Sequence, residues 1–99
     1  MILERYVKQP GETKDYDIDY TPWLAPMADT IQYATANVTC LNNPNDISLL
    51  ASPVEFTPTS VKVWVSGGTN RNRYKIDIRV TTVGGRIDES ELLFSVRDL

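Results

Sequence analysis

Three aspartates alternate along one short segment, at Asp15, Asp17 and Asp19. The spacing Asp-x-Asp-x-Asp opens the calcium loop of EF-hand proteins, where carboxylate oxygens bind the ion. The rest of that loop is missing, because Tyr20 stands where the glycine belongs and Pro26 where the bidentate glutamate belongs. The pattern therefore favours an exposed acidic face, whose charge keeps a strand from pairing with other chains.

A second group of charged residues follows the glycine pair Gly67-Gly68. Arg71, Arg73 and Arg79, with Tyr74 among them, have the composition of a patch that binds a phosphate or a sugar. The glycines lack the spacing of a phosphate-binding or dinucleotide-binding loop. We therefore expect a flexible, solvated loop, which on a rigid scaffold is also a good docking element.

Residues suited to catalysis are few. The chain has no histidine, so the usual general base and the commonest metal ligand are both missing. Cys40 is the single cysteine, and without a base beside it we expect a small buried apolar residue. Glu89 and Glu91 resemble the carboxylate pair of a glycosidase, but the strand pattern around them predicts that they face water. We expect no enzyme, no cofactor and no metal.

Size and charge narrow the function further. The chain has 99 residues, enough for one domain over 1–99, with residues 1–10 as an N-terminal arm. Its net charge of −3 argues against a general nucleic-acid binder. No apolar run approaches the ~20 residues of a membrane span, and the N-terminus lacks a signal-peptide pattern. We expect neither nucleic acid nor membrane among the partners.

Period-2 alternation dominates the chain and predicts strands. The expected strands are 15–20, 30–41, 47–50, 54–57, 61–66, 74–82 and one over the last residues that carries Leu92, Phe94 and Val96. The parity change within 30–41 indicates a bulge. Residues 21–29, with two prolines, read as an irregular corner in which Trp23 and Leu24 close one end of the core. Residues 42–46 form a turn, and no segment predicts a helix.

The last hairpin has a predictable register. A two-residue turn at Gly84-Gly85 would place the apolar set of the final strand on the wrong side of the sheet. A three-residue loop, 83–85, instead places Tyr74 opposite Phe94 and Ile76 opposite Leu92. Gly85 then occupies the left-handed position of that loop.

About seven short strands in roughly a hundred residues indicate an all-β fold, an immunoglobulin-like antiparallel β-sandwich. A small open barrel is the alternative. Trp64 has the opposite parity to the valines of its strand, so it either faces solvent as an interface anchor or lies under a second covered face. The candidate contact residues for a protein interface are Trp64, Gly67, Gly68, Thr69, Asn70, Arg71, Arg73, Asp15, Asp17 and Asp19.

Two stretches of the chain resemble a known family. The first is Asp15-Tyr16-Asp17-Ile18-Asp19-Tyr20, followed by Trp23-Leu24 and Asp29-Thr30-Ile31. The second is Val63-Trp64-Val65-Ser66-Gly67-Gly68-Thr69, then Tyr74, Val80-Thr81-Thr82 and Gly85-Arg86. Together they are similar to small virion proteins of tailed bacteriophages described as fibre-to-tail adaptors, over about residues 8 to 97.

The resemblance implies a β-sandwich in the virion that joins other virion proteins, such as tail, fibre, portal or capsid proteins. It implies many copies in a symmetric assembly and carries no catalytic residues. The leading hypothesis is an adaptor that joins the tail fibre to the tail or portal region. The alternatives are a capsid decoration protein and a carbohydrate- or receptor-binding module built on Trp64, Tyr74 and the arginine loop.

Overall fold

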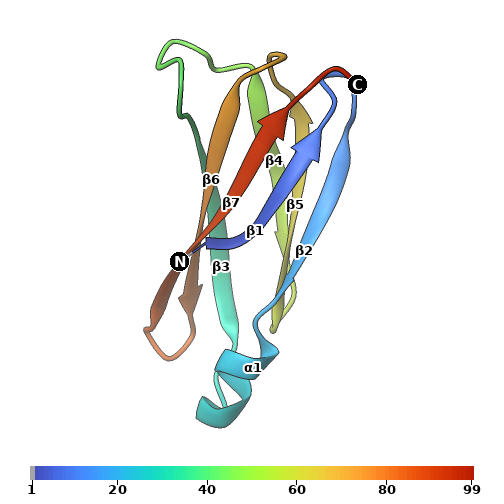
Figure 1. Ribbon diagram of the computed structural model, residues 1–99. Coiled ribbons are helices and arrows are strands. Elements are labelled where there is room, and N and C mark those ends of the chain that lie inside the picture. Colours follow the sequence, from blue (N-terminus) through green and yellow to red (C-terminus); the bar gives the residue numbers. More distant parts are fainter. Residues whose placement is uncertain (1) are drawn as a thin grey trace.

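The computed structural model describes residues 2–99, which form two β-sheets and one short helical corner (Figure 1). The strands are β1 (Ile2–Lys8), β2 (Lys14–Asp19), β3 (Ile31–Cys40), β4 (Leu49–Phe56), β5 (Ser60–Gly67), β6 (Arg73–Thr82) and β7 (Ile87–Val96). The corner consists of α1 (Thr21–Leu24) and the 3-10 turn η1 (Ala25–Met27).

The two sheets confirm the seven-stranded β-sandwich. Sheet A has the order β1-β7-β6-β3 and sheet B the order β2-β5-β4. The adjacencies β2-β5-β4 and β7-β6-β3 are those of strands B-E-D and G-F-C in immunoglobulin domains. The inter-sheet disulfide cannot form with one cysteine, and β3 holds no tryptophan, so these immunoglobulin hallmarks are missing. One pairing departs from an antiparallel sandwich, because β1 runs parallel to β7.

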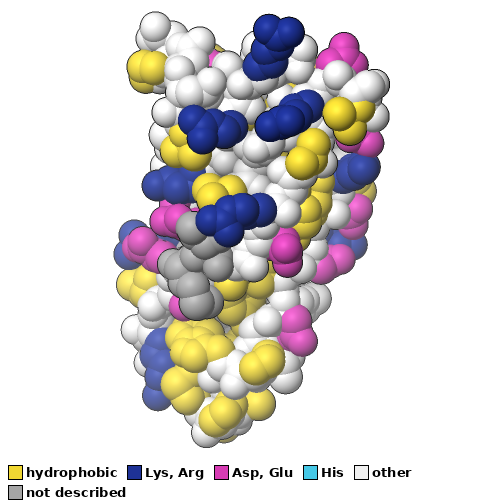
Figure 2. Space-filling view, viewed as in Figure 1, with side chains coloured by type: hydrophobic (Ala, Val, Ile, Leu, Met, Phe, Trp, Pro, Cys, Tyr) yellow, Lys and Arg dark blue, Asp and Glu magenta, His cyan; other side chains and the backbone are white. Residues whose placement is uncertain are grey.

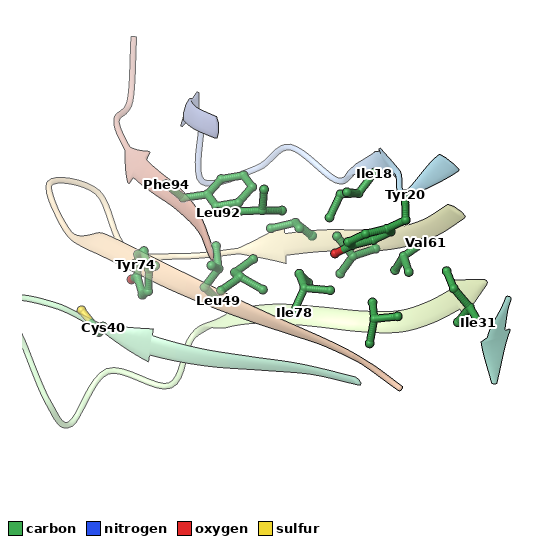
Figure 3. Close-up of a cluster of buried hydrophobic side chains, with 14 of the residues drawn as sticks. Ile18, Tyr20, Ile31, Cys40, Leu49, Val61, Tyr74, Ile78, Leu92 and Phe94 are labelled. Atoms are coloured by element: carbon green, nitrogen blue, oxygen red, sulfur yellow. The ribbon is translucent and has the colours of Figure 1, made fainter. Parts of the chain in front are cut away.

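The core lies between the sheets and follows the period-2 pattern of the strands (Figure 3). Alternate residues of β5, β6 and β7 point inward and most of them are fully buried, whereas the residues between them face out. The innermost side chains are Val61, Val63, Val65, Tyr74, Ile76, Ile78, Val80, Leu92, Phe94 and Val96. Cys40 is also buried, as expected of a small apolar residue.

The β6–β7 hairpin has the predicted register. Tyr74 lies opposite Phe94, and Ile76 lies opposite Leu92. The N–H of Thr82 donates to the carbonyl of Arg86 at 2.8 Å, which closes the three-residue loop. Gly85 has a φ of +88°, the left-handed conformation that glycine adopts without a steric penalty. Parity therefore determined the register, since a shift of one residue would have exposed the apolar face.

The corner at residues 21–29 is helical, which the sequence does not predict. Pro22 sits in the first turn of α1, where its missing N–H costs nothing, and Pro26 sits likewise in η1. Leu24 is fully buried and Trp23 packs partly against the core, so together they close that end of the sandwich as expected.

Two other segments differ from expectation. Residues 49–56 form one strand with a bulge around Ser52 and Pro53, rather than two short strands, and Ile47 and Ser48 lie outside it. Residues 2–8, expected as part of an arm, form β1 beside β7. Tyr6 accounts for the position of β1, because its ring packs against two others. The centroid of the Tyr6 ring lies 5.1 Å from that of Phe94 and 4.5 Å from that of Tyr16.

Candidate interaction surfaces

The outer side of sheet B carries an acidic face. Asp15, Asp17 and Asp19 alternate outward along β2, and Glu55 faces the same way from β4. The single cation within this face is Lys62, whose Nζ lies 3.5 Å from Oδ2 of Asp15. We call Asp15, Asp17, Asp19, Glu55, Lys62 and Trp64 the acidic face.

Trp64 lies on the central strand of sheet B, at the Asp15 end of the acidic face. It pairs across the strands with Asp15, and its strand neighbours Val63 and Val65 point into the core. The side chain is therefore on the outer side of the sheet, where it is partly exposed. Trp64 and the three aspartates, chosen separately from the sequence, belong to one continuous surface.

The opposite side of the molecule carries a basic end. Arg5 and Arg73 face outward from sheet A, Arg71 extends from the β5–β6 loop, and Arg97 follows β7. None of these four arginines, which we call the basic end, forms an ion pair within residues 2–99. Figure 2 shows Lys and Arg side chains gathered toward the end where β1 and β7 finish.

A shallow hollow of about 500 Å³ lies within the basic end. Its walls come from residues 70–72 of the β5–β6 loop, Arg73 at the start of β6, and residues 95–99 at the end of β7 and beyond it. The β6–β7 hairpin brings Arg73 and Arg97 to the same end of the molecule, but the sequence does not reveal that Arg5 joins them, because the parallel pairing of β1 with β7 places Arg5 there. A prediction that β1 pairs with β7 was needed to find the full surface.

The loop of the basic end is held by hydrogen bonds, which corrects the expectation of a flexible loop. The N–H of Thr69 donates to the hydroxyl of Tyr74 at 2.8 Å, and that of Arg71 donates to the carbonyl of Val96 at 2.8 Å. The side-chain oxygen of Asn70 accepts from the N–H of Asp98 at 2.9 Å. The loop thus displays its arginines from a backbone fixed on both sides.

Gly67 and Gly68 shape this loop, but they are partly buried and have no side chains with which to contact a partner. Both have positive φ, and a Cβ on Gly67 would lie 2.3 Å from the carbonyl oxygen of Ser48. A Cβ on Gly68 would press on Val96 and Leu49. Their role is local backbone geometry, whereas Thr69, Asn70, Arg71 and Arg73 are exposed.

Asp46 connects the β3–β4 loop to the β5–β6 loop. Its carboxylate accepts hydrogen bonds from the hydroxyl and the N–H of Ser48, from the hydroxyl of Tyr74 and from the amide of Asn72. The Ser48 hydroxyl, followed by that of Tyr74, holds the pKa of Asp46 well below its usual range. A tyrosine at this place, bonded to the backbone upstream, resembles the tyrosine corner of immunoglobulin-like sandwiches.

Tyr74 is therefore part of the structure and not of a binding patch. Its side chain is fully buried, so it does not form the basic-aromatic patch that the sequence favours less than a solvated loop. Arg79 also lies apart from the other arginines, directly opposite Glu89. Glu91 lies opposite Asp77, and both glutamates face outward, as predicted.

Lys8 is a buried lysine at the end of β1. Its ammonium donates to the carbonyl oxygens of Gly67 at 2.6 Å and Gln9 at 2.8 Å. Burial lowers the pKa of this ammonium, while the Glu12 carboxylate acts in the opposite direction. The bond to Gly67 ties β1 of sheet A to the end of β5 in sheet B.

No group of three or more potential metal ligands occurs in the part of the chain that the structure describes. None of its helices is long and apolar enough to cross a membrane.

Comparison with known proteins gives one family. A search of curated proteins finds no match. A family model described as "Podophage GP4 fiber-tail adaptor protein gp77" matches residues 8–95, which span both surfaces except for Arg5 and Arg97. The chain belongs to this family of podophage fibre-tail adaptor proteins.

Proposed function

We propose that the protein joins the tail fibre to the tail or portal region of a podophage particle, through two separate protein-binding surfaces and without catalysis. The family supports a structural adaptor of the virion. An adaptor of this kind has to bind two different proteins at once, and so needs two surfaces that do not compete.

The observation that carries the proposal is the opposite charge of the acidic face and the basic end. Four carboxylates against one lysine make the first attractive to a basic partner, and the four unpaired arginines make the second attractive to an acidic one. Complementary charge gives specificity and a faster encounter with the correct partner. Trp64 adds a large side chain of the type that anchors interfaces.

The experiment is a pair of charge reversals made in the phage. One variant carries Asp17→Arg with Glu55→Arg, and the other carries Arg73→Glu with Arg97→Glu. Mass spectrometry of purified particles then measures how much adaptor and how much fibre each particle holds. The control is Val83→Lys, an exposed change outside both surfaces.

We expect one reversal to remove both proteins from the particle and the other to leave the adaptor but remove the fibre. Far-UV circular dichroism of the purified variants establishes that they fold. Wild-type particles without the adaptor, or normal fibre content in both reversals, would contradict the proposal. An adaptor located on the capsid would favour the decoration alternative.

A further inference from the structure

The sandwich has four edge strands, and three of them carry features that block pairing with another chain. β2 presents its aspartates, β4 has a bulge at Pro53, and β1 carries Glu4 and Arg5. Charges, prolines and bulges are the means by which natural sheets protect their edges. β3 has neither a charged residue nor a proline in its ten residues, and its one bulge lies at its start.

The free edge of β3 has unused backbone groups. The N–H of Leu41 donates to the carbonyl of Arg73 in the β6 ladder, at 2.7 Å. In an antiparallel strand, alternate residues point their N–H and C=O to opposite sides. The peptide groups of Ala34, Ala36 and Val38 therefore point away from β6, toward the free edge.

The core is also incompletely covered along this edge. The inward side chains of β6 are fully buried, whereas Ala34, Ala36 and Val38 on β3 are only partly buried. The same holds for Ala51 and Val54 on β4, the strand of sheet B that lies beside β3. Phe56 of β4 is 45% exposed. A strand added to β3 would pair with its backbone and cover this apolar seam.

We propose that the added strand is β3 of a second copy of this chain, paired antiparallel about a two-fold axis at Asn37. In this register Ala36 lies opposite the second copy's Val38, and Thr35 lies opposite the second copy's Thr39. The groups that point to the free edge are then the ones that form hydrogen bonds. The two sheets A join into one continuous sheet across an isologous interface.

The register explains two exposed side chains. Tyr33 and Leu41 are each 50% exposed on the outer side of sheet A. The two-fold axis at Asn37 places Tyr33 of one copy directly opposite Leu41 of the other, so each covers its partner. Every other opposed pair is neutral, and threonine pairs across strands are favourable.

The other edges do not favour a second copy in this way. A β2 strand paired with itself about Asp17 would place Asp15 opposite Asp19, and like charges directly opposite each other are destabilising. The same two-fold axis at β3 brings the two β4 strands to one side of the joined sheet. The inference stands on these observations and does not depend on the adaptor function.

A cysteine at the two-fold axis tests the register. Asn37→Cys is made in a Cys40→Ala background. The two Cα atoms at position 37 would form a non-hydrogen-bonded pair about 4.5 Å apart, within the range for a disulfide. The matched control is Thr35→Cys in the same background, because its two copies would lie about 14 Å apart.

We expect mild oxidation to convert Asn37→Cys to a covalent dimer on a non-reducing gel and to leave Thr35→Cys monomeric. Equal cross-linking of the two variants, or none in Asn37→Cys, would overturn the register. The two proteins differ only at positions 35 and 37, and circular dichroism shows whether each is folded.

Sedimentation velocity tests the dimer without a new cysteine. Asn37→Lys places two ammonium groups opposite each other and should weaken dimerisation by up to about fivefold. Thr13→Lys, an exposed change in the β1–β2 loop, should dimerise like the wild type. A wild-type protein that is monomeric at every concentration up to its solubility limit would rule out the proposal.

Discussion

At the scale of single residues, one carboxylate organises the loops of the basic end. Asp46 accepts from two loops and from β6, and Tyr74 in turn accepts from the N–H of Thr69. These bonds connect segments that are far apart in the sequence. The shape of the arginine surface therefore depends on Asp46, which is half-buried, and on Tyr74, which is fully buried.

The first prediction concerns Tyr74→Phe. The change keeps the buried ring, but it removes the donor to Asp46 and leaves the N–H of Thr69 without its acceptor. We expect the free energy of unfolding to fall by about 1–3 kcal/mol, measured by urea denaturation. Tyr33→Phe is the control, because that hydroxyl is on an exposed side chain. Equal effects of the two changes would contradict the role given to Tyr74.

The second prediction concerns acid stability. Hydrogen bonds from Thr82, followed by those from the N–H groups of Thr30 and Gly84 and from Arg86, lower the pKa of Asp29 to about 2. Because the pKa of Asp29 is lower in the folded chain, the ionised carboxylate stabilises the fold at pH values above the unfolded pKa of 3.8. This contribution is lost as the pH falls from about 5 toward 2.

The measurement is the free energy of unfolding against pH for the wild type and for Asp29→Asn. We expect a shallower fall in acid for the variant, because it has no carboxylate to protonate at this position. Asp17→Asn is the control, since Asp17 makes no hydrogen bond or ion pair within residues 2–99. An unchanged slope in Asp29→Asn would show that the hydrogen bonds of Asp29 do not contribute to the acid dependence of stability.

At the scale of elements, strands with clear alternation could be predicted and strands that depend on distant partners could not. The β6–β7 register followed from parity alone, because one register buries the apolar face and the other exposes it. β1 has no such alternation, and its place is set by Tyr6 packing on Phe94 and by the buried Lys8. No local pattern reports those contacts.

The acidic face and the basic end also differ in how far the sequence predicts them. The aspartates could be placed outward from their strand, since alternation assigns each side chain to a face. For Trp64, alternation gave the face opposite to the valines but not whether that face is covered. The basic end could not be assembled in full, because only the parallel β1–β7 pairing places Arg5 beside β7. For Tyr74, its neighbours in the sequence raised a binding patch as an alternative, but its parity with Ile76 predicted an inward position, and the side chain is buried in the core.

The third prediction is a graded series of glycine substitutions. Gly11→Ala should change stability little, since nothing lies within 4 Å of the added Cβ. Gly85→Ala should cost about 1 kcal/mol, because its φ of +88° penalises a side chain although the space is open. Gly67→Ala should cost more, because a positive φ is combined with a clash against the Ser48 carbonyl.

Thermal unfolding of the three variants ranks them. A Gly85→Ala protein as unstable as Gly67→Ala would show that the strained turn alone, and not the contact with Ser48, determines the loss.

At the scale of the whole molecule, the two sheets share one core and most contacts join residues distant in the sequence. The fourth prediction is that residues 2–99 unfold in one transition. Tryptophan fluorescence reports on Trp64 of sheet B and on Trp23 of the corner, and far-UV circular dichroism reports on all strands. The midpoints in urea should coincide. Separate midpoints would indicate that the corner unfolds on its own.

The parallel pairing of β1 with β7 has a mechanical consequence. A pull on the start of β1 and on the end of β7 draws two neighbouring strands past each other along their length. The hydrogen bonds between them lie across the direction of force, so the whole ladder is loaded in shear and its bonds must break together. An antiparallel pair pulled at one end would instead unzip one bond at a time. A connector with this geometry resists tension along the line between its termini.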